Sequence, residues 1–250
     1  MNIFDNYRIT SYDVLICVCT HFRKTGDFRE EVRKWWSNLN DGEKLFWPLC
    51  GLNILVFLAW KIPGLQPSMM RWFMSNPGSQ SRCLPLILNT FSHYSLIHLG
   101  CNMMVLHSFM PNTVHLMGKE QFLALYLNAG VISSLASMAH KVARGKTSYS
   151  LGASGAICGI VGTFAAFYPD ARMSLLFLPM YTFSATTAVK GLMALDAAGL
   201  VLGWKVFDHM AHLSGVLCGL GWAYYGAPAI WGRRESLVTA WHNLRTAKWD

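Results

Sequence analysis

Six long stretches of this 250-residue chain contain no Asp, Glu, Lys or Arg, and their lengths constrain the fold strongly. They cover residues 45–60, 83–118, 121–140, 147–169, 173–189 and 209–232. Several match the ~20 residues that a helix needs to cross a lipid bilayer. Charged residues make up 14% of the chain, against roughly 25% in an ordinary soluble domain. The pattern predicts that lipid is the solvent for much of this chain.

Helices are the structure expected in these stretches. Backbone groups in lipid must be hydrogen-bonded within the protein, which leaves helices and closed barrels as the possible spanning structures. The apolar runs lack the period-two alternation of barrel strands, and a soluble protein of this size would show polar faces along its helices. We therefore predict an all-α fold, a polytopic membrane protein with a bundle of six transmembrane helices.

The predicted spans lie near residues 45–60, 91–109, 121–140, 150–170, 182–201 and 209–226, with 172–180 as an interfacial connector. We expect three parts: a polar or interfacial N-terminal segment over 1–44, the six-helix core over 45–228, and a polar tail over 229–250. Residues 29–39 suit an interfacial helix or an approach helix to the first span. The distribution of Lys and Arg favours both termini on the inner side.

The net charge of +8 does not indicate a nucleic-acid partner, because the basic residues are spread over loops and ends rather than along one face. The seven cysteines, at 17, 19, 50, 83, 101, 158 and 218, show no metal-binding or disulfide spacing. We expect them to be small apolar fillers of a packed interior. No metal and no cofactor are predicted.

Polar side chains within apolar spans are costly, so each is a functional candidate. His98 and Asn102 are four residues apart and share one face of the second predicted span. His93 lies about a turn earlier. Imidazole and carboxamide groups donate hydrogen bonds without an obligatory positive charge, which suits the stabilisation of an oxyanion. The alternative is hydrogen bonding between helices.

The stretch around Ser154 has two interpretations. This serine is a nucleophile only if an adjacent base can accept its proton. Gly155, Gly159 and Gly162 instead predict a seam of small residues along which helices pack closely. The motif also differs from the elbow of soluble hydrolases, because Ala156 stands where that motif requires glycine. Taken alone, this stretch favours the packing seam.

A third cluster contains His209 and His212, with Gly215 and Gly219 forming a glycine face after them. His212 is a candidate general base. Asp208 could orient this histidine, although an aspartate at the start of a helix is more often an N-cap. Because no other acid is close in sequence, we expect a Ser–His dyad rather than a complete triad.

The three clusters together form a pattern that is more specific than any one of them. It reads H-x-x-x-x-H-x-x-x-N from His93, G-x-S-G from Gly152, and A-H-x-x-G-x-x-x-G from Ala211. This ordered set resembles the rhomboid intramembrane serine proteases, over roughly residues 45–228. The segments "VRKWWSNL", "LGASGAI", "FLPMYTF" and "LGWKVFDHMAHL" are similar to mitochondrial members of that family. The similarity implies the inner mitochondrial membrane.

The resemblance implies a function and a set of roles. Ser154 is the nucleophile and His212 its general base, while His98, Asn102 and the backbone N–H of Ser154 bind the oxyanion. The supporting residues are His93, Gly152, Gly155, Gly215 and Gly219. The reaction implied is cofactor-independent endopeptidase cleavage of transmembrane segments of membrane-protein substrates, through an acyl-enzyme.

Two departures from the family pattern are visible. Residues 1–44 show neither a clear additional helix nor an Arg- and Ser-rich transit peptide, so we expect a processed, truncated or alternatively started form. Cys158 stands where bacterial relatives often carry an aromatic residue, so packing around His212 is expected to differ. The alternative function is an inactive rhomboid-like protein that binds or escorts membrane proteins. A transporter is a weaker hypothesis, because the two halves show no convincing repeat.

Overall fold

The computed structural model describes residues 27–79, 81, 83–175 and 178–246. The chain divides into two compact units, Met1–Asn40 and Asp41–Asp250. In the first unit, residues 27–38 form a helix whose side chains are exposed, including Trp35 and Trp36. Helical structure was expected over 29–39. Cysteines 17 and 19 lie outside the described residues.

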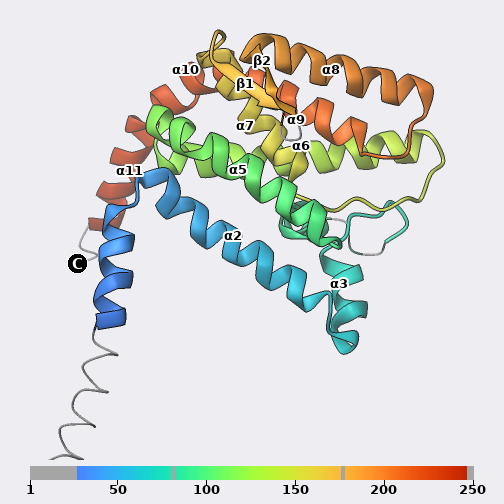
Figure 1. The fold of residues 1–250 in the computed structure, drawn as a ribbon, viewed down its shortest axis with the longest axis horizontal. Coiled ribbons are helices and arrows are strands. Elements are labelled where there is room, and N and C mark those ends of the chain that lie inside the picture. Colours follow the sequence, from blue (N-terminus) through green and yellow to red (C-terminus); the bar gives the residue numbers. More distant parts are fainter. Residues whose placement is uncertain (1–26, 80, 82, 176–177, 247–250) are drawn as a thin grey trace, which may run out of the picture. The chain divides into compact units, whose positions relative to one another are not determined.

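The second unit is built almost entirely of helices (Figure 1). Its long helices are α2 (Asp41–Ala59), α5 (Leu96–Met117), α6 (Lys119–Ala143), α7 (Ser154–Phe167), α8 (Ala185–Leu202) and α9 (His209–Gly221). Four short helices connect α2 to α5, namely η1 (Pro63–Leu65), α3 (Gln66–Trp72), α4 (Cys83–Leu88) and η2 (Asn89–Phe91). After α9 the chain continues through η3 (Trp222–Gly226), α10 (Ala227–Ala229), η4 (Trp231–Arg233) and α11 (Glu235–Thr246). The predicted all-α fold class is confirmed.

Each predicted span overlaps one long helix, although the boundaries differ. The second span was expected from residue 91, but α5 begins at Leu96 because Ser95 has an extended backbone conformation. Among the described helices, α2, α6 and α8 are long and apolar enough to cross a membrane, and α7 is a shorter apolar helix. The number of six spans therefore stays a prediction.

A β-hairpin occupies the segment for which an interfacial connector was expected. Strand β1 (Arg172–Leu175) pairs antiparallel with β2 (Leu178–Ser184), with Arg172 opposite Ser184. Aromatic and β-branched residues such as Tyr181 and Thr182 favour extended structure here. Ser184 then caps α8 by accepting a hydrogen bond from the Thr187 N–H at 3.2 Å. The fifth helix consequently starts later than residue 182.

Helix α7 lies at the centre of the second unit, where it packs against both α6 and α9 (Figure 1). Helix α8 packs on α9, α5 contacts α7, and α2 packs on α5. The contact between α7 and α9 is made by backbone: a Cβ added to Gly215 would overlap the carbonyl oxygen of Gly155. The close packing predicted for these glycines is present, and it brings the first residue of α7 next to α9.

Candidate active site

Ser154 and His212 lie within hydrogen-bond distance of each other. Ser154 is the first residue of α7, His212 is in the first turn of α9, and the serine Oγ is 3.0 Å from the histidine Nε2. Ser154 is half-buried, and 15% of the His212 side chain is exposed. A hydroxyl beside an imidazole nitrogen is the arrangement in which the base can accept the hydroxyl proton.

The start of α7 places backbone N–H groups beside the serine. The first four N–H groups of a helix have no partner within that helix. Here the Ile157 N–H makes the first i→i−4 bond, to the Ala153 carbonyl at 2.9 Å, so the Ser154 N–H precedes the hydrogen-bonded ladder. The positive end of the helix dipole lies at the same point. Both features favour negative charge next to Ser154.

Two histidines from the first cluster approach the segment that leads into α7. The His98 ring lies against Gly152, where an added Cβ would be 2.6 Å from His98 Cε1. Gly152 also has a φ of 129°, which other residues rarely adopt. His93 is fully buried, and its Nε2 accepts the Ala153 N–H at 3.4 Å. The fold therefore brings the first cluster to the Ser154 segment.

Asn102 lies one turn after His98 on α5 and is buried. Its Nδ2 donates a hydrogen bond to the His98 carbonyl at 2.9 Å, within the same helix. A carboxamide nitrogen carries two hydrogens, so one such bond leaves a second donor. The oxyanion role of Asn102 stays a proposal.

Asp208 is an N-cap, as the sequence favoured. Its Oδ1 accepts the Ala211 N–H at 3.2 Å, and its Oδ2 lies 2.8 Å from the Lys141 Nζ and accepts from Ser137 and Ser150. Burial alone would raise the pKa of Asp208, but the charge and hydrogen bond of Lys141 and the serine hydroxyls outweigh it and lower the pKa. The carboxylate therefore joins α6 to the start of α9 rather than orienting His212.

Asp196, which the sequence interpretation passed over, faces His212 from α8. Its Oδ1 lies 3.5 Å from the His212 Nδ1 and 2.8 Å from the His209 Nδ1, and the residue is 1% exposed. The sequence does contain a signal for this residue, a carboxylate inside the fifth predicted span. Ionisable residues in spans are rare and tend to be functional. Two histidines thus share one buried carboxylate.

Cys158 lies one turn after Ser154 on α7 and is buried. A Cβ added to Gly215 would lie 3.2 Å from the Cys158 Cβ, so Cys158 packs against the glycine face of α9. The interpretation of cysteines as buried fillers fits Cys50 and Cys158, whereas Cys83 is exposed. Within the described part of the chain, no group of three His, Cys, Asp or Glu residues is arranged to hold a metal ion.

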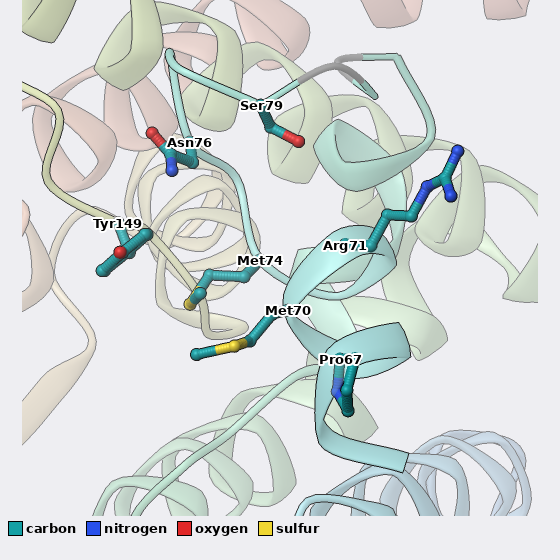
Figure 2. Close-up of a pocket in the computed structure, with 7 residues that line it drawn as sticks. All are labelled: Pro67, Met70, Arg71, Met74, Asn76, Ser79 and Tyr149. Atoms are coloured by element: carbon teal, nitrogen blue, oxygen red, sulfur yellow. The ribbon is translucent and has the colours of Figure 1, made fainter. Parts of the chain in front are cut away.

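A separate pocket of about 350 Å³ lies between α3, the segment after α3 and the segment before α7 (Figure 2). The residues that line it are Pro67, Met70, Arg71, Met74, Asn76, Ser79 and Tyr149. The Arg71 side chain points away from Met70 and Met74 in Figure 2. The Ser75 and Ser150 backbones exchange two 2.9 Å hydrogen bonds, which tie this loop to the segment leading to Ser154. None of the predicted site residues lines the pocket.

Comparison with known proteins identifies the family. The Rhomboid domain matches residues 80–229, which include His93, Asn102, Ser154 and His212. The human presenilin-associated rhomboid-like protein, mitochondrial, is 49% identical over 224 residues, which cover 90% of this chain and 59% of the human protein. The yeast mitochondrial Rhomboid protein 1 is 32% identical over 200 residues, covering 79% of this chain and 58% of the yeast protein.

A zebrafish relative, presenilin-associated rhomboid-like protein A, mitochondrial, is 47% identical over 86% of this chain and 56% of its own length. The chain thus spans less than two thirds of the length of these three relatives. All three are mitochondrial by name, and the matched domain contains the apolar helices α6 and α8. The chain is therefore an integral, multi-pass membrane protein that belongs to the rhomboid family.

Proposed function

We propose that this protein is an intramembrane serine endopeptidase that cleaves transmembrane segments of membrane proteins in the inner mitochondrial membrane. The observation that carries the proposal is the 3.0 Å contact between Ser154 Oγ and His212 Nε2 at the start of two closely packed helices. Membership of the rhomboid family and the mitochondrial names of the relatives support it.

The first half of the reaction forms an acyl-enzyme. His212 Nε2 accepts the proton of the Ser154 hydroxyl as Oγ attacks the carbonyl carbon of the scissile peptide bond. The carbonyl oxygen becomes an oxyanion, which the Ser154 N–H, His98 and Asn102 stabilise. The C–N bond then breaks, the imidazolium gives its proton to the leaving amine, and the acyl group stays on Oγ.

The second half hydrolyses the acyl-enzyme. A water molecule gives one proton to His212 Nε2 and attacks the acyl carbon, and the resulting oxyanion occupies the same site. When the bond to Oγ breaks, the imidazolium returns its proton to Ser154. The partial exposure of both side chains supports access of water to this site.

The substrate segment must have an extended backbone at the cleavage point. A helix hides its carbonyl carbons inside the hydrogen-bonded ladder, whereas an extended peptide presents them to a nucleophile. Gly and Pro residues weaken a transmembrane helix, so segments that contain them fit the proposal.

A fluorophosphonate probe tests the nucleophile directly. We expect the purified protein in detergent to be labelled, and Ser154→Ala and His212→Ala to lose labelling. The matched control is Ser108→Ala, because the Ser108 hydroxyl is exposed and bonds only to its own helix at Met104 in the described contacts. Cleavage of a transmembrane peptide with a Gly-Pro break, reconstituted in liposomes, is measured on the same four proteins.

Equal labelling of the wild type and both variants would show that Ser154 is not the nucleophile. The alternative is an inactive rhomboid-like binding protein. A well-folded wild type that is not labelled and cleaves no peptide, but that binds membrane proteins, would favour this alternative. Labelling that depends on both residues, together with cleavage, would support the proposal.

A further inference from the structure

Asp196 is a carboxylate in the interior of the helical unit. It lies on α8 and is 1% exposed. A buried carboxylate is unfavourable unless partners stabilise its charge. Its Oδ1 faces two histidine nitrogens, whereas Oδ2 has no hydrogen-bond partner among the described residues. The polar contacts that the described residues make with Asp196 therefore all lie on the histidine side.

The two nitrogens of the His212 ring have different neighbours. Nε2 lies 3.0 Å from Ser154 Oγ, and Nδ1 lies 3.5 Å from Asp196 Oδ1. A neutral imidazole accepts a proton at Nε2 only if its own proton is on Nδ1. A carboxylate oxygen near Nδ1 favours that tautomer. The geometry therefore suits His212 to act as the base for Ser154.

We propose that Asp196 is a positioning residue for His212. It favours the tautomer protonated on Nδ1 and stabilises the imidazolium that forms when Nε2 takes the Ser154 proton. This inference rests on the proposed function of the Ser154–His212 pair. The proton stays on the ring nitrogen throughout, as in a Ser-His-Asp triad.

The 3.5 Å separation is longer than an ordinary hydrogen bond. The attraction grows when the ring becomes positive, because opposite charges interact strongly where water is excluded. Catalytic hydrogen bonds are often long in the free enzyme and shorten in the complex. The effect of Asp196 is therefore expected mainly on the transition state rather than on substrate binding.

His209 holds the carboxylate in place. Its Nδ1 lies 2.8 Å from Asp196 Oδ1, and its ring packs on α8 at Gly199, where an added Cβ would be 2.5 Å from the ring. A purely structural role of Asp196, as a tie between α8 and α9, would act through this contact. A variant of His209 therefore distinguishes a structural role of Asp196 from a positioning role.

Other titratable groups face this site from the surrounding helices. They are His98 on α5, Cys158 on α7 and His209 on α9. A positive charge on His98 repels one on His212, and a thiol is neutral when protonated. The Asp208 carboxylate at the start of α9 is already paired with Lys141. Asp196 is thus the group facing the His212 ring that attracts the imidazolium.

Asp196→Asn tests the proposal, because it removes the charge and keeps the size of the side chain. We expect kcat to fall roughly 10- to 100-fold with little change in KM. We also expect the acid limb of the pH profile to move to lower pH, because the imidazolium forms less readily without the carboxylate. Asp170→Asn is the matched control, since Asp170 is exposed before β1 and is expected to keep wild-type kinetics.

His209→Ala provides the second comparison. If Asp196 acts only as a tie through His209, this variant should reproduce the loss in Asp196→Asn without moving the pH profile. We expect instead that His209→Ala loses less kcat than Asp196→Asn, and that only Asp196→Asn moves the acid limb of the pH profile. An Asp196→Asn enzyme with wild-type kcat and pH profile would overturn the proposal, as would an equal effect of both variants.

Nitrogen-15 spectra of the histidine side chains, assigned with His212→Ala, give a readout that does not require turnover. We expect the Nδ1-protonated tautomer of His212 in the wild type and its loss in Asp196→Asn. If the wild type shows this tautomer and loses it in Asp196→Asn but neither labels nor cleaves, the proposed function fails, whereas the effect of Asp196 on the His212 tautomer stands. If the wild type cleaves and Asp196→Asn leaves the tautomer unchanged, the inference fails and the proposed function stands.

Discussion

Gly219 of α9 lies directly against Gly159 of α7, so closely that a Cβ on Gly219 would overlap the Gly159 carbonyl oxygen and lie 3.0 Å from its Cα. The obstruction is backbone, which cannot turn aside as a flexible side chain does. The spacing of α7 and α9 therefore depends on glycine here. The same two helices carry Ser154 and His212, so this spacing also decides whether those two side chains meet.

Gly219→Ala is expected to destabilise the fold by about 1–3 kcal/mol, because overpacking a close helix contact forces the helices apart. Probe labelling of Ser154 should fall as well. Gly221→Ala is the matched control on the same helix, since an added Cβ there meets nothing within 4 Å. Thermal unfolding in detergent measures the stability of both variants. Equal melting temperatures for the two variants would contradict the role of the glycine contact.

Gly152→Ala is expected to reduce turnover more than it reduces stability. The φ of 129° strains any other residue by about 1–3 kcal/mol, and the new methyl would displace the His98 ring from its place beside the segment that leads to Ser154. Gly100→Ala on α5 is the control, because the space around Gly100 is open. Initial cleavage rates and unfolding are compared, and wild-type rates for Gly152→Ala would refute the prediction.

Asn102→Ala should keep the fold and lower kcat by about two to three powers of ten, the usual effect of losing one oxyanion donor. Asn128→Ala is a close control: the Asn128 Nδ2 donates to the carbonyl of Ala124, four residues earlier on α6, at 2.7 Å, but is exposed. Both variants lose the same kind of local bond. Steady-state kinetics decide the matter, and equal rates for the two variants would exclude Asn102 from the oxyanion site.

The Lys141–Asp208 pair should make stability depend on pH. The folded state lowers the pKa of Asp208, so the unfolded chain binds this proton first on acidification. The stabilisation is complete above the usual Asp pKa of about 3.9. It is lost as the pH falls through the lowered folded value. We therefore expect the melting temperature to drop below about pH 4.

Asp208→Asn should remove this part of the pH dependence while keeping a capping side chain. At neutral pH the variant should lose about 2 kcal/mol, less than the ~3–5 kcal/mol for a fully buried pair, because 24% of the Asp208 side chain is exposed. Unfolding between pH 3 and 7 is measured for wild type, Asp208→Asn and the exposed control Asp170→Asn. Parallel curves for wild type and Asp208→Asn would contradict the prediction.

The sequence by itself determined the helical membrane class and the order of its functional clusters. Long uncharged stretches leave the backbone only its own hydrogen bonds, so the helices could be placed from composition and length. The contact between Ser154 and His212 was expected from the resemblance, since each lies in a short local motif. The cap at Asp208 was also expected, because capping acts within one turn of the chain.

Only the tertiary structure decided which distant groups meet. The β-hairpin over Arg172–Leu175 and Leu178–Ser184 depends on pairing between strands, which hydropathy does not reveal. Lys141 reaches Asp208 because α6 and α9 pack together, and Asp196 reaches His209 and His212 because α8 packs on α9. Local sequence rules describe forces within a few residues, whereas these contacts are set by how glycine-lined helices approach one another in three dimensions.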